Sequence, residues 1–207
     1  QPWLDDYPLV RRQVLGALDD ISVVTVVSET VRRTVREVVG DRQLETRLLP
    51  NVLDEGTFTP PDEEWERIPG RLLFVGAVRK VKGLDVAVQA LNRLQNRHSN
   101  AHLRVVGEPF RRSYREDERE VRQLIQRLGL SERVTFVGGL PPEDVAKEMR
   151  AARALVVPSR RESFSSVTLE ALACGTPVVA TRCGGPEELL NDESGILVEP
   201  DDPDVVA

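Results

Sequence analysis

The chain of 207 residues has only two cysteines, Cys174 and Cys183, and they do not form a C-x-x-C pair. The sequence therefore indicates neither a zinc site nor a redox pair, and two reduced thiols are expected. Long apolar runs are also missing. No run approaches the roughly 18 residues of a membrane-spanning helix, and the N-terminus has no charged start followed by an apolar signal segment. We therefore expect a soluble cytoplasmic protein without a transmembrane segment.

The chain also lacks an excess of positive charge, since its formal net charge is −6. Affinity for nucleic acid comes mainly from Lys and Arg, so this balance argues against a nucleic-acid partner. The chain does contain 40% hydrophobic and 30% charged residues. That composition is ordinary for a globular protein with a sizeable core.

Short apolar runs alternate with amphipathic helical patterns from residue 71 onward. The runs have the length of strands, and most stop at a small or turn-forming residue; they cover 72–76, 103–107, 134–138, 155–158, 177–180 and 196–198. Continuous apolar strands alternating with helices predict a parallel sheet covered on both faces. The expected fold class is therefore α/β, a doubly wound, Rossmann-like sheet that binds ligands outside the carboxyl ends of its strands.

The part of the chain before residue 50 has its own alternation. Apolar residues predict a helix over 9–18, a strand over 21–27, a helix after the N-cap Ser28, and a strand over 45–49. Residues 50–70 are rich in Pro, Asp and Glu and show little periodicity. This segment is interpreted as a linker and as the best domain boundary in the chain.

The most informative stretch runs from Glu162 to Glu170, Glu-Ser-Phe-Ser-Ser-Val-Thr-Leu-Glu. A strand-like run precedes it and a helical pattern follows, so it is a strand-to-helix turn. Ser163, Ser165 and Ser166 are small hydroxyl residues that can cap a helix and let a ligand approach the backbone. A helix start presents unpaired N–H groups and a positive dipole end, which suits a phosphate.

Glu170 fits a capping role poorly. A capping box needs Ser or Thr three residues before the Glu, and Val167 occupies that position. A first-turn Glu attracted by the helix dipole, worth about 0.3–1 kcal/mol, stays open as an alternative. If Glu170 instead points into the cleft, its two oxygens can accept both vicinal hydroxyls of a ribose. Glu162 could then reach the hydroxyls of a sugar.

Two further strand ends are candidate parts of the same site. The loop from Gly76 to Gly83 holds three cations, Arg79, Lys80 and Lys82, and can clamp a diphosphate, with each charge-assisted hydrogen bond contributing about 1.5–3 kcal/mol. A solvated basic loop is the alternative. The backbone at Gly138, before Gly139-Leu-Pro-Pro142, could meet a nucleobase edge, although a tight turn explains it better.

From Ile21 to its end, the chain resembles the C-terminal, donor-binding half of the retaining family-4 glycosyltransferases, which have a GT-B fold. Three segments carry the likeness. Glu162 to Glu170 matches the E-x7-E motif, with a typical continuation through Ala180 to Gly184-Gly-Pro-Glu187. The segment from Leu73 to Gly83 matches the strand and donor-phosphate loop, and Leu49-Pro-Asn-Val-Leu-Asp54 is similar to the family's hinge.

The resemblance implies a role for each matching residue. Glu170 would bind the donor ribose, Glu162 would contact the transferred sugar near its reacting centre, and Lys82 would hold the diphosphate. The remaining donor-binding candidates are small or backbone contacts: Gly76, Gly138 and the run Ser163, Phe164, Ser165, Ser166 and Val167. Ala77 stands where family members usually carry Arg, so Arg79 is the candidate replacement for that cation.

The resemblance also implies a division of the chain. Residues 1–49 would be the last elements of an otherwise missing acceptor domain, 50–70 the hinge, and 71–207 a nucleotide-sugar-binding domain truncated at its C-terminus. The expected function is a hexosyltransferase reaction with retention, from a UDP- or GDP-type sugar to an unknown hydroxyl acceptor. Family likeness implies no bound metal and no other cofactor, and this piece alone should be inactive. A sugar-nucleotide epimerase of the same fold and a noncatalytic nucleotide-sugar-binding module are the alternatives.

Overall fold

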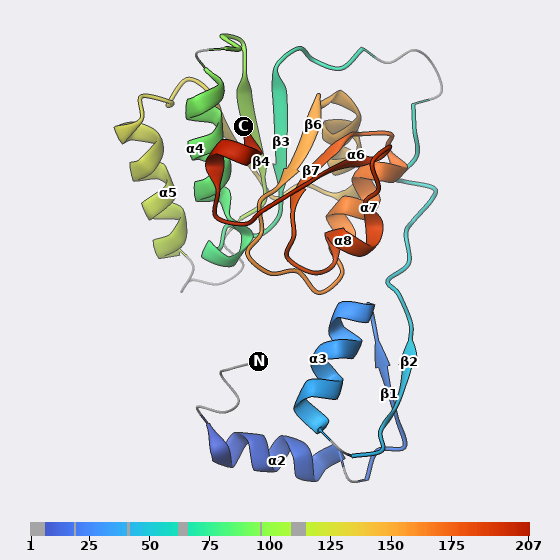
Figure 1. The fold of residues 1–207 in the computed structure, drawn as a ribbon. Coiled ribbons are helices and arrows are strands. Elements are labelled where there is room, and N and C mark those ends of the chain that lie inside the picture. The colour runs from blue at the N-terminus through green and yellow to red at the C-terminus, as the bar shows by residue number, and fades with distance from the viewer. Residues whose placement is uncertain (1–6, 19, 41, 62–65, 96, 109–114) are drawn as a thin grey trace. The chain divides into compact units, whose positions relative to one another are not determined.

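A computed structural model describes residues 7–18, 20–40, 42–61, 66–95, 97–108 and 115–207 (Figure 1). The chain divides into two compact units, Gln1–Val52 and Leu53–Ala207. Within the described residues, no helix is both long and apolar enough to cross a membrane.

The first unit has the predicted order of helix, strand, helix and strand. Its elements are α2 (Pro8–Leu18), β1 (Val23–Val26), α3 (Glu29–Val39) and β2 (Glu45–Leu48). Ser28 is the N-cap of α3, because its side chain accepts a hydrogen bond from the Val31 N–H at 3.1 Å. The strands pair in parallel from Val23 opposite Glu45 to Val26 opposite Leu48. The predictions for this part of the chain are confirmed, with a strand β1 shorter than expected.

The second unit is built on a six-stranded parallel sheet. Every predicted run forms a strand: β3 (Arg71–Val75), β4 (His102–Val106), β5 (Val134–Gly138), β6 (Ala154–Val157), β7 (Val178–Thr181) and β8 (Gly195–Val198). Their order across the sheet is β5-β4-β3-β6-β7-β8, and all neighbours are parallel. This is the doubly wound, Rossmann-like order, whose direction reverses between β3 and β6.

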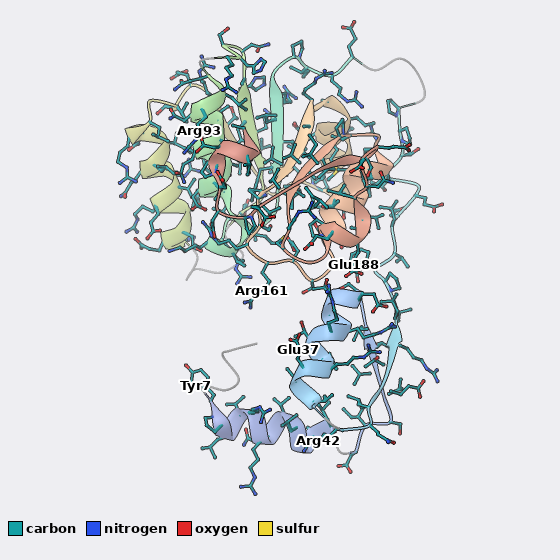
Figure 2. All side chains as sticks on the ribbon, viewed as in Figure 1. Tyr7, Glu37, Arg42, Arg93, Arg161 and Glu188 are labelled. Carbon is teal, nitrogen blue, oxygen red and sulfur yellow. The ribbon has the colours of Figure 1, made fainter. Side chains whose placement is uncertain are left out.

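Helices cover both faces of this sheet. They are α4 (Leu84–Leu94), α5 (Arg115–Arg127), α6 (Pro142–Ala151), α7 (Ser166–Ala173), and the four-residue helices α8 (Pro186–Leu189) and α9 (Pro203–Val206). The two four-residue helices have no counterpart in the sequence analysis, because four residues carry no readable hydrophobic period. Arg93 of α4, which Figure 2 labels, forms an ion pair with Asp204 of α9.

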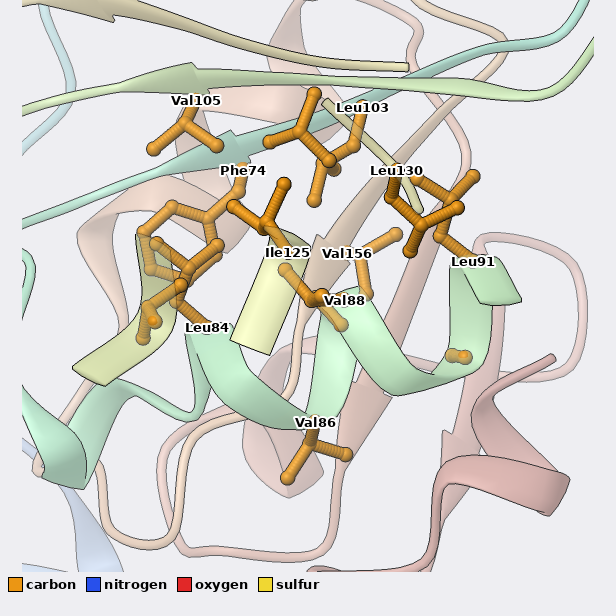
Figure 3. Close-up of a cluster of buried hydrophobic side chains, with 14 of the residues drawn as sticks. Phe74, Leu84, Val86, Val88, Leu91, Leu103, Val105, Ile125, Leu130 and Val156 are labelled. Atoms are coloured by element: carbon orange, nitrogen blue, oxygen red, sulfur yellow. The ribbon is translucent and has the colours of Figure 1, made fainter. Parts of the chain in front are cut away.

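Alternate residues of the central strands point into two separate buried clusters, as the pleat of a strand requires. Phe74 of β3 packs with α4 and α5 in one cluster, drawn in Figure 3 with Leu84, Leu103 and Ile125. Leu73, its neighbour, belongs to the other cluster, which includes Met149 of α6 and Ala171 of α7. Burial on both faces confirms the predicted architecture and explains why the strands are continuous apolar runs.

The segment over 50–70 begins before the division between the two units. Its described part after that point packs on the second unit: Phe58 is buried in the cluster with Met149, and the Ile68 N–H donates to the Ala151 carbonyl at 2.9 Å. Arg150 also donates to the Thr59 carbonyl at 3.1 Å. The domain roles expected from the family resemblance stay predictions.

Candidate functional site

The candidate site lies where the strand order reverses. The chain leaves β3 into the 3-10 turn η1 (Lys80–Lys82) and leaves β6 into the segment that holds Glu162. Because β3 and β6 are neighbours in a parallel sheet, their following loops emerge at the same edge. In doubly wound sheets this switch point is where ligands bind.

Lys82 and Glu162 meet at that edge. The Lys82 Nζ lies 2.6 Å from Glu162 Oε1, and the two side chains are 29% and 9% exposed. The same carboxylate oxygen accepts a hydrogen bond from Ser159 Oγ at 2.8 Å. The backbone of Glu162 is held too, since its N–H donates to the Cys183 carbonyl at 2.9 Å. Two residues that are 80 positions apart are therefore brought into direct contact.

The turn that carries Lys82 depends on a close approach of two backbones. Gly83 has a φ of +70°, and a Cβ at this position would lie 1.9 Å from the Pro158 carbonyl oxygen at the end of β6. Any side chain would overlap that carbonyl, so glycine allows η1 to lie against β6. The turn is also held by α5, because the Lys80 N–H donates to Asp117 Oδ2 at 2.7 Å.

The three cations of this loop do not point to one place. Lys82 contacts Glu162, whereas Arg79 and Lys80 line a cavity of about 200 Å³ with residues of α4 and α5 such as Leu84 and Leu124. Lys82 is thus the cation that the structure puts beside the E-x7-E segment. The role of Arg79 as a replacement cation stays a prediction.

The start of α7 differs in detail from the expected cap. Ser165 occupies the N-cap position with a φ of +70°, and its hydroxyl bonds to the hydroxyl of Thr168 at 2.8 Å instead of to a backbone N–H. Both side chains are buried. Ser165 is thus the N-cap residue of α7, as the sequence allowed, but its hydroxyl is paired with that of Thr168 and makes no capping bond. Ser163 and Ser166 are exposed beside it, and Phe164 and Val167 are partly buried.

Glu170 lies in the second turn of α7 and is partly buried. The first turn contains no acidic residue, so the alternative that pairs Glu170 with the helix dipole is wrong. Burial raises the pKa of the Glu170 carboxyl above its ordinary value. No hydrogen bond or ion pair to this carboxylate is formed by any residue that the structure describes. Its oxygens are available to a ligand with hydroxyl donors.

A second glycine contact supports the turn between Glu162 and α7. A Cβ at Gly185 would lie 2.3 Å from the Phe164 carbonyl carbon. The Gly185 N–H donates to the Glu162 carbonyl at 3.1 Å, and the Gly184 N–H donates to Glu187 Oε1 at 3.1 Å. The Gly184-Gly-Pro-Glu187 segment thus braces the backbone of the E-x7-E turn.

Gly76 follows β3 and Gly138 ends β5, the two strands on either side of β4. The Gly76 N–H donates to the Val106 carbonyl at 2.9 Å, and the Gly107 N–H donates to the Gly138 carbonyl at 2.8 Å. Gly138 lines an open groove of about 650 Å³ at the carboxyl ends of β4 and β5, together with Glu108 and Phe136. Both glycines therefore lie at the predicted edge of the sheet.

Sequence reasoning missed three residues around the ion pair. Ser159 binds the Glu162 carboxylate, and the Arg160 N–H donates to the Val81 carbonyl inside η1 at 2.8 Å. Burial, with the nearby carboxylates of Glu162 and Glu187, raises the pKa of the Cys183 thiol to about 11, although the Thr181 hydroxyl and Lys82 act in the opposite direction. Ser159 and Arg160 come directly after the predicted strand over 155–158, and this position could have marked them as candidates for the site. The position of Cys183 in the sequence gave no such indication.

Cys174 and Cys183 are free thiols. Across the described ranges of the chain, no three His, Cys, Asp or Glu side chains gather closely enough to hold a metal ion.

Comparison with known families gives one clear match. Residues 60–207 match the family described as Glycosyl transferases group 1. A D-inositol 3-phosphate glycosyltransferase of Acidothermus cellulolyticus is 35% identical over 213 residues, which cover 96% of this chain and 47% of the relative. A protein of the same name from Corynebacterium jeikeium is 41% identical over 170 residues, covering 76% of this chain and 40% of the relative. The chain thus spans about half the length of these curated relatives.

Solved structures agree with this match. A sucrose-phosphate synthase from Thermosynechococcus elongatus superposes with a TM-score of 0.81 at 31% identity, covering 93% of this chain and 49% of that one. The Anabaena protein HepE, solved in complex with UDP-glucose, gives a TM-score of 0.84 at 22% identity over 95% of this chain and 55% of that one. At that identity the second likeness concerns the fold alone.

Proposed function

Because the chain belongs to the glycosyl transferases of group 1, we propose that it forms the donor-binding half of an enzyme that transfers a sugar from a nucleotide-diphosphate sugar to a hydroxyl acceptor. Its second unit has the Rossmann-like architecture of the glycosyltransferases with a GT-B fold. Membership of this family favours sugar transfer over the epimerase reaction.

The Lys82–Glu162 ion pair at the switch point is the observation that carries the proposal. An ammonium at this place can bind the phosphates and stabilise the negative charge that develops on the leaving nucleotide. Glu162 beside it can accept hydrogen bonds from the hydroxyls of the sugar. Cation and carboxylate in contact suit a ligand whose phosphate and hydroxyl groups are neighbours.

The other candidate residues would bind the remaining parts of the donor. The partly buried Glu170 carboxylate would accept the two ribose hydroxyls. The start of α7, from Ser163 to Val167, would offer backbone N–H groups to phosphate or sugar. Gly76 would let the donor approach the end of β3, and Gly138 would meet the nucleobase in its groove.

The proposed reaction exchanges one bond at the anomeric carbon of the sugar. The bond from this carbon to the distal phosphate oxygen breaks, and a bond to the acceptor oxygen forms. The acceptor proton passes to the leaving phosphate oxygen, so a nucleoside diphosphate is released. With attack from the face that the phosphate leaves, the configuration is retained. Lys82 supplies the positive charge at the phosphate in this scheme, without a resident metal.

Calorimetric titration of the chain with UDP and GDP tests the proposal. We expect one of the two to bind. Glu170→Ala should weaken binding at least tenfold, or about 1.4 kcal/mol. Glu132→Ala, an exposed carboxylate before β5, is the matched control and should bind as the unchanged chain does. A folded chain that binds neither nucleotide would contradict the site. Equal affinity with and without EDTA would support nucleotide binding without a metal.

The acceptor and the complete reaction need the whole protein. The names of the relatives make D-inositol 3-phosphate the first acceptor to test. We expect the 207-residue chain alone to bind donor without measurable transfer. A full-length protein that binds UDP-sugars but transfers to no acceptor would favour the noncatalytic module. The cytoplasmic location expected from the sequence stays a prediction.

A further inference from the structure

Arg160, at the end of β6, is bonded to three other segments of the second unit. Its guanidinium donates to both carboxylate oxygens of Asp85, at 2.9 and 2.8 Å. The guanidinium Nε lies 2.7 Å from Asp201 Oδ1 in the loop after β8. A further N–H donates to the Lys80 carbonyl in η1. One side chain thus joins the start of α4, the cation turn η1 and the C-terminal loop.

The backbone of Arg160 adds a contact on the same turn. Its N–H donates to the Val81 carbonyl at 2.8 Å. The carbonyls of Lys80 and Val81, the two residues before Lys82, are therefore both bound by Arg160. Arg160 also precedes Glu162 by two residues. It holds the peptide that carries the cation and belongs to the segment that carries the carboxylate.

The donors of Arg160 are almost fully used inside the protein. A guanidinium has five N–H donors, and the contacts to Asp85, Asp201 and Lys80 occupy four of them. Hydrogen bonding to Asp85, and the charges of Asp85 and Asp201, raise the pKa of Arg160, although burial acts against this. A two-pronged arginine–carboxylate contact fixes direction as well as distance. Lys82, in contrast, has a flexible side chain that is held, among the residues that the structure describes, by Glu162 alone.

We infer that Arg160 is a positioning residue that sets the Lys82 ammonium against the distal phosphate of the donor, with Asp85 and Asp201 fixing the guanidinium. The inference rests on the proposed function. It assigns Arg160 no contact with the ligand. Its effect is carried through the η1 backbone and is specific for the phosphate that Lys82 binds.

The test compares UDP with UMP, which lacks the distal phosphate, by titration of the 207-residue chain. Arg160→Gln should weaken the binding of UDP about tenfold and the binding of UMP less than twofold. In a Lys82→Ala background, the same change should alter UDP affinity less than twofold, because the ammonium to be positioned is gone. Arg160→Lys keeps the charge but loses the two-pronged contact with Asp85, and should lose nearly as much UDP affinity as Arg160→Gln.

Arg93→Gln is the matched control. Arg93 also joins α4 to the C-terminal segment, through Asp204, but does not touch η1. It should leave the ratio of UDP to UMP affinity unchanged. Asp85→Asn weakens the anchor of Arg160 without removing the arginine, and it should also reduce UDP affinity more than UMP affinity. This variant replaces the Arg160 variants in the test if those fail to fold.

Three outcomes would overturn the inference. Equal weakening of UDP and UMP would give Arg160 a merely structural role. Full recovery by Arg160→Lys would mean that its charge attracts the phosphate directly. Additive losses with Lys82→Ala would mean that the two residues act separately. If the unchanged chain binds neither nucleotide, the proposed function fails first, and this inference with it.

Discussion

The ammonium of Lys82 and the carboxylate of Glu162 are in contact, 2.6 Å apart, at the point where the strand order of the sheet reverses. The pair joins the loop after β3 to the loop after β6. A donor that places its phosphate on Lys82 meets a negative charge beside it. The Glu162 carboxylate therefore opposes the bare diphosphate, while it offers a hydrogen-bond acceptor to the hydroxyls of the sugar.

Glu162→Gln should consequently strengthen the binding of UDP while abolishing transfer by the full-length protein. Removal of a like charge about 4 Å from the phosphate is worth roughly 1 kcal/mol when water screens the pair fully, which is about fivefold in affinity and a lower bound at a partly buried site. Lys82→Ala should change UDP affinity in the opposite direction. Titration of both variants with UDP measures the two effects. Weaker UDP binding by Glu162→Gln would show that the carboxylate serves mainly to hold Lys82 in place.

Gly83→Ala should destabilise the second unit by more than the cost of placing alanine at a positive φ. Gly83 and Gly129 have φ values of +70° and +68°, but only at Gly83 would a Cβ meet another group, the Pro158 carbonyl. Gly129→Ala should cost about 1–2 kcal/mol for its left-handed backbone, and Gly83→Ala a further 1–3 kcal/mol from overlap. Urea unfolding of both variants checks this. Equal losses would mean that η1 moves away from β6 at little cost.

Glu170→Gln should stabilise the chain at neutral pH although it weakens nucleotide binding. Burial raises the pKa of Glu170 in the folded state, so folding loses stability as the pH rises from the unfolded pKa through the folded one. The uncharged amide removes that loss. Its melting temperature should exceed that of the unchanged chain at pH 7 and match it below the unfolded pKa of about 4.3. Glu132→Gln, at an exposed site, should show no such difference.

Cys183 should react slowly with alkylating reagents at pH 8. With its pKa raised to about 11, roughly one thiol in a thousand is ionised there, and the thiolate is the reactive form. In a Cys174→Ser background, iodoacetamide should modify Cys183 roughly two-hundredfold more slowly than a cysteine peptide, whose pKa is about 8.5. Glu162→Gln should speed the reaction, since that carboxylate contributes to the raised pKa. A rate equal to that of the peptide would contradict the burial of the thiol.

The hydrophobic pattern was sufficient to predict the architecture. Runs such as 72–76 and 155–158 are apolar throughout because β3 and β6 are buried on both faces, with Leu73 and Phe74 in different clusters. This pattern is local and readable without a structure. The E-x7-E stretch was likewise readable, because its strand, turn and helix follow one another in sequence. The four-residue helices α8 and α9 were not, since they have no period.

The order of apolar runs along the chain is enough to predict a parallel α/β sheet and to say which residue types stand at its strand ends. Which of those residues meet depends on how the strands are ordered in the folded protein. Lys82, among three cations of one loop, is the one in contact with Glu162, Thr168 takes the hydroxyl of Ser165, and Arg160 holds η1 through Asp85 and Asp201. These pairings join segments distant in sequence or depend on the direction of single side chains. They follow from strand order and backbone packing, and no local pattern records them.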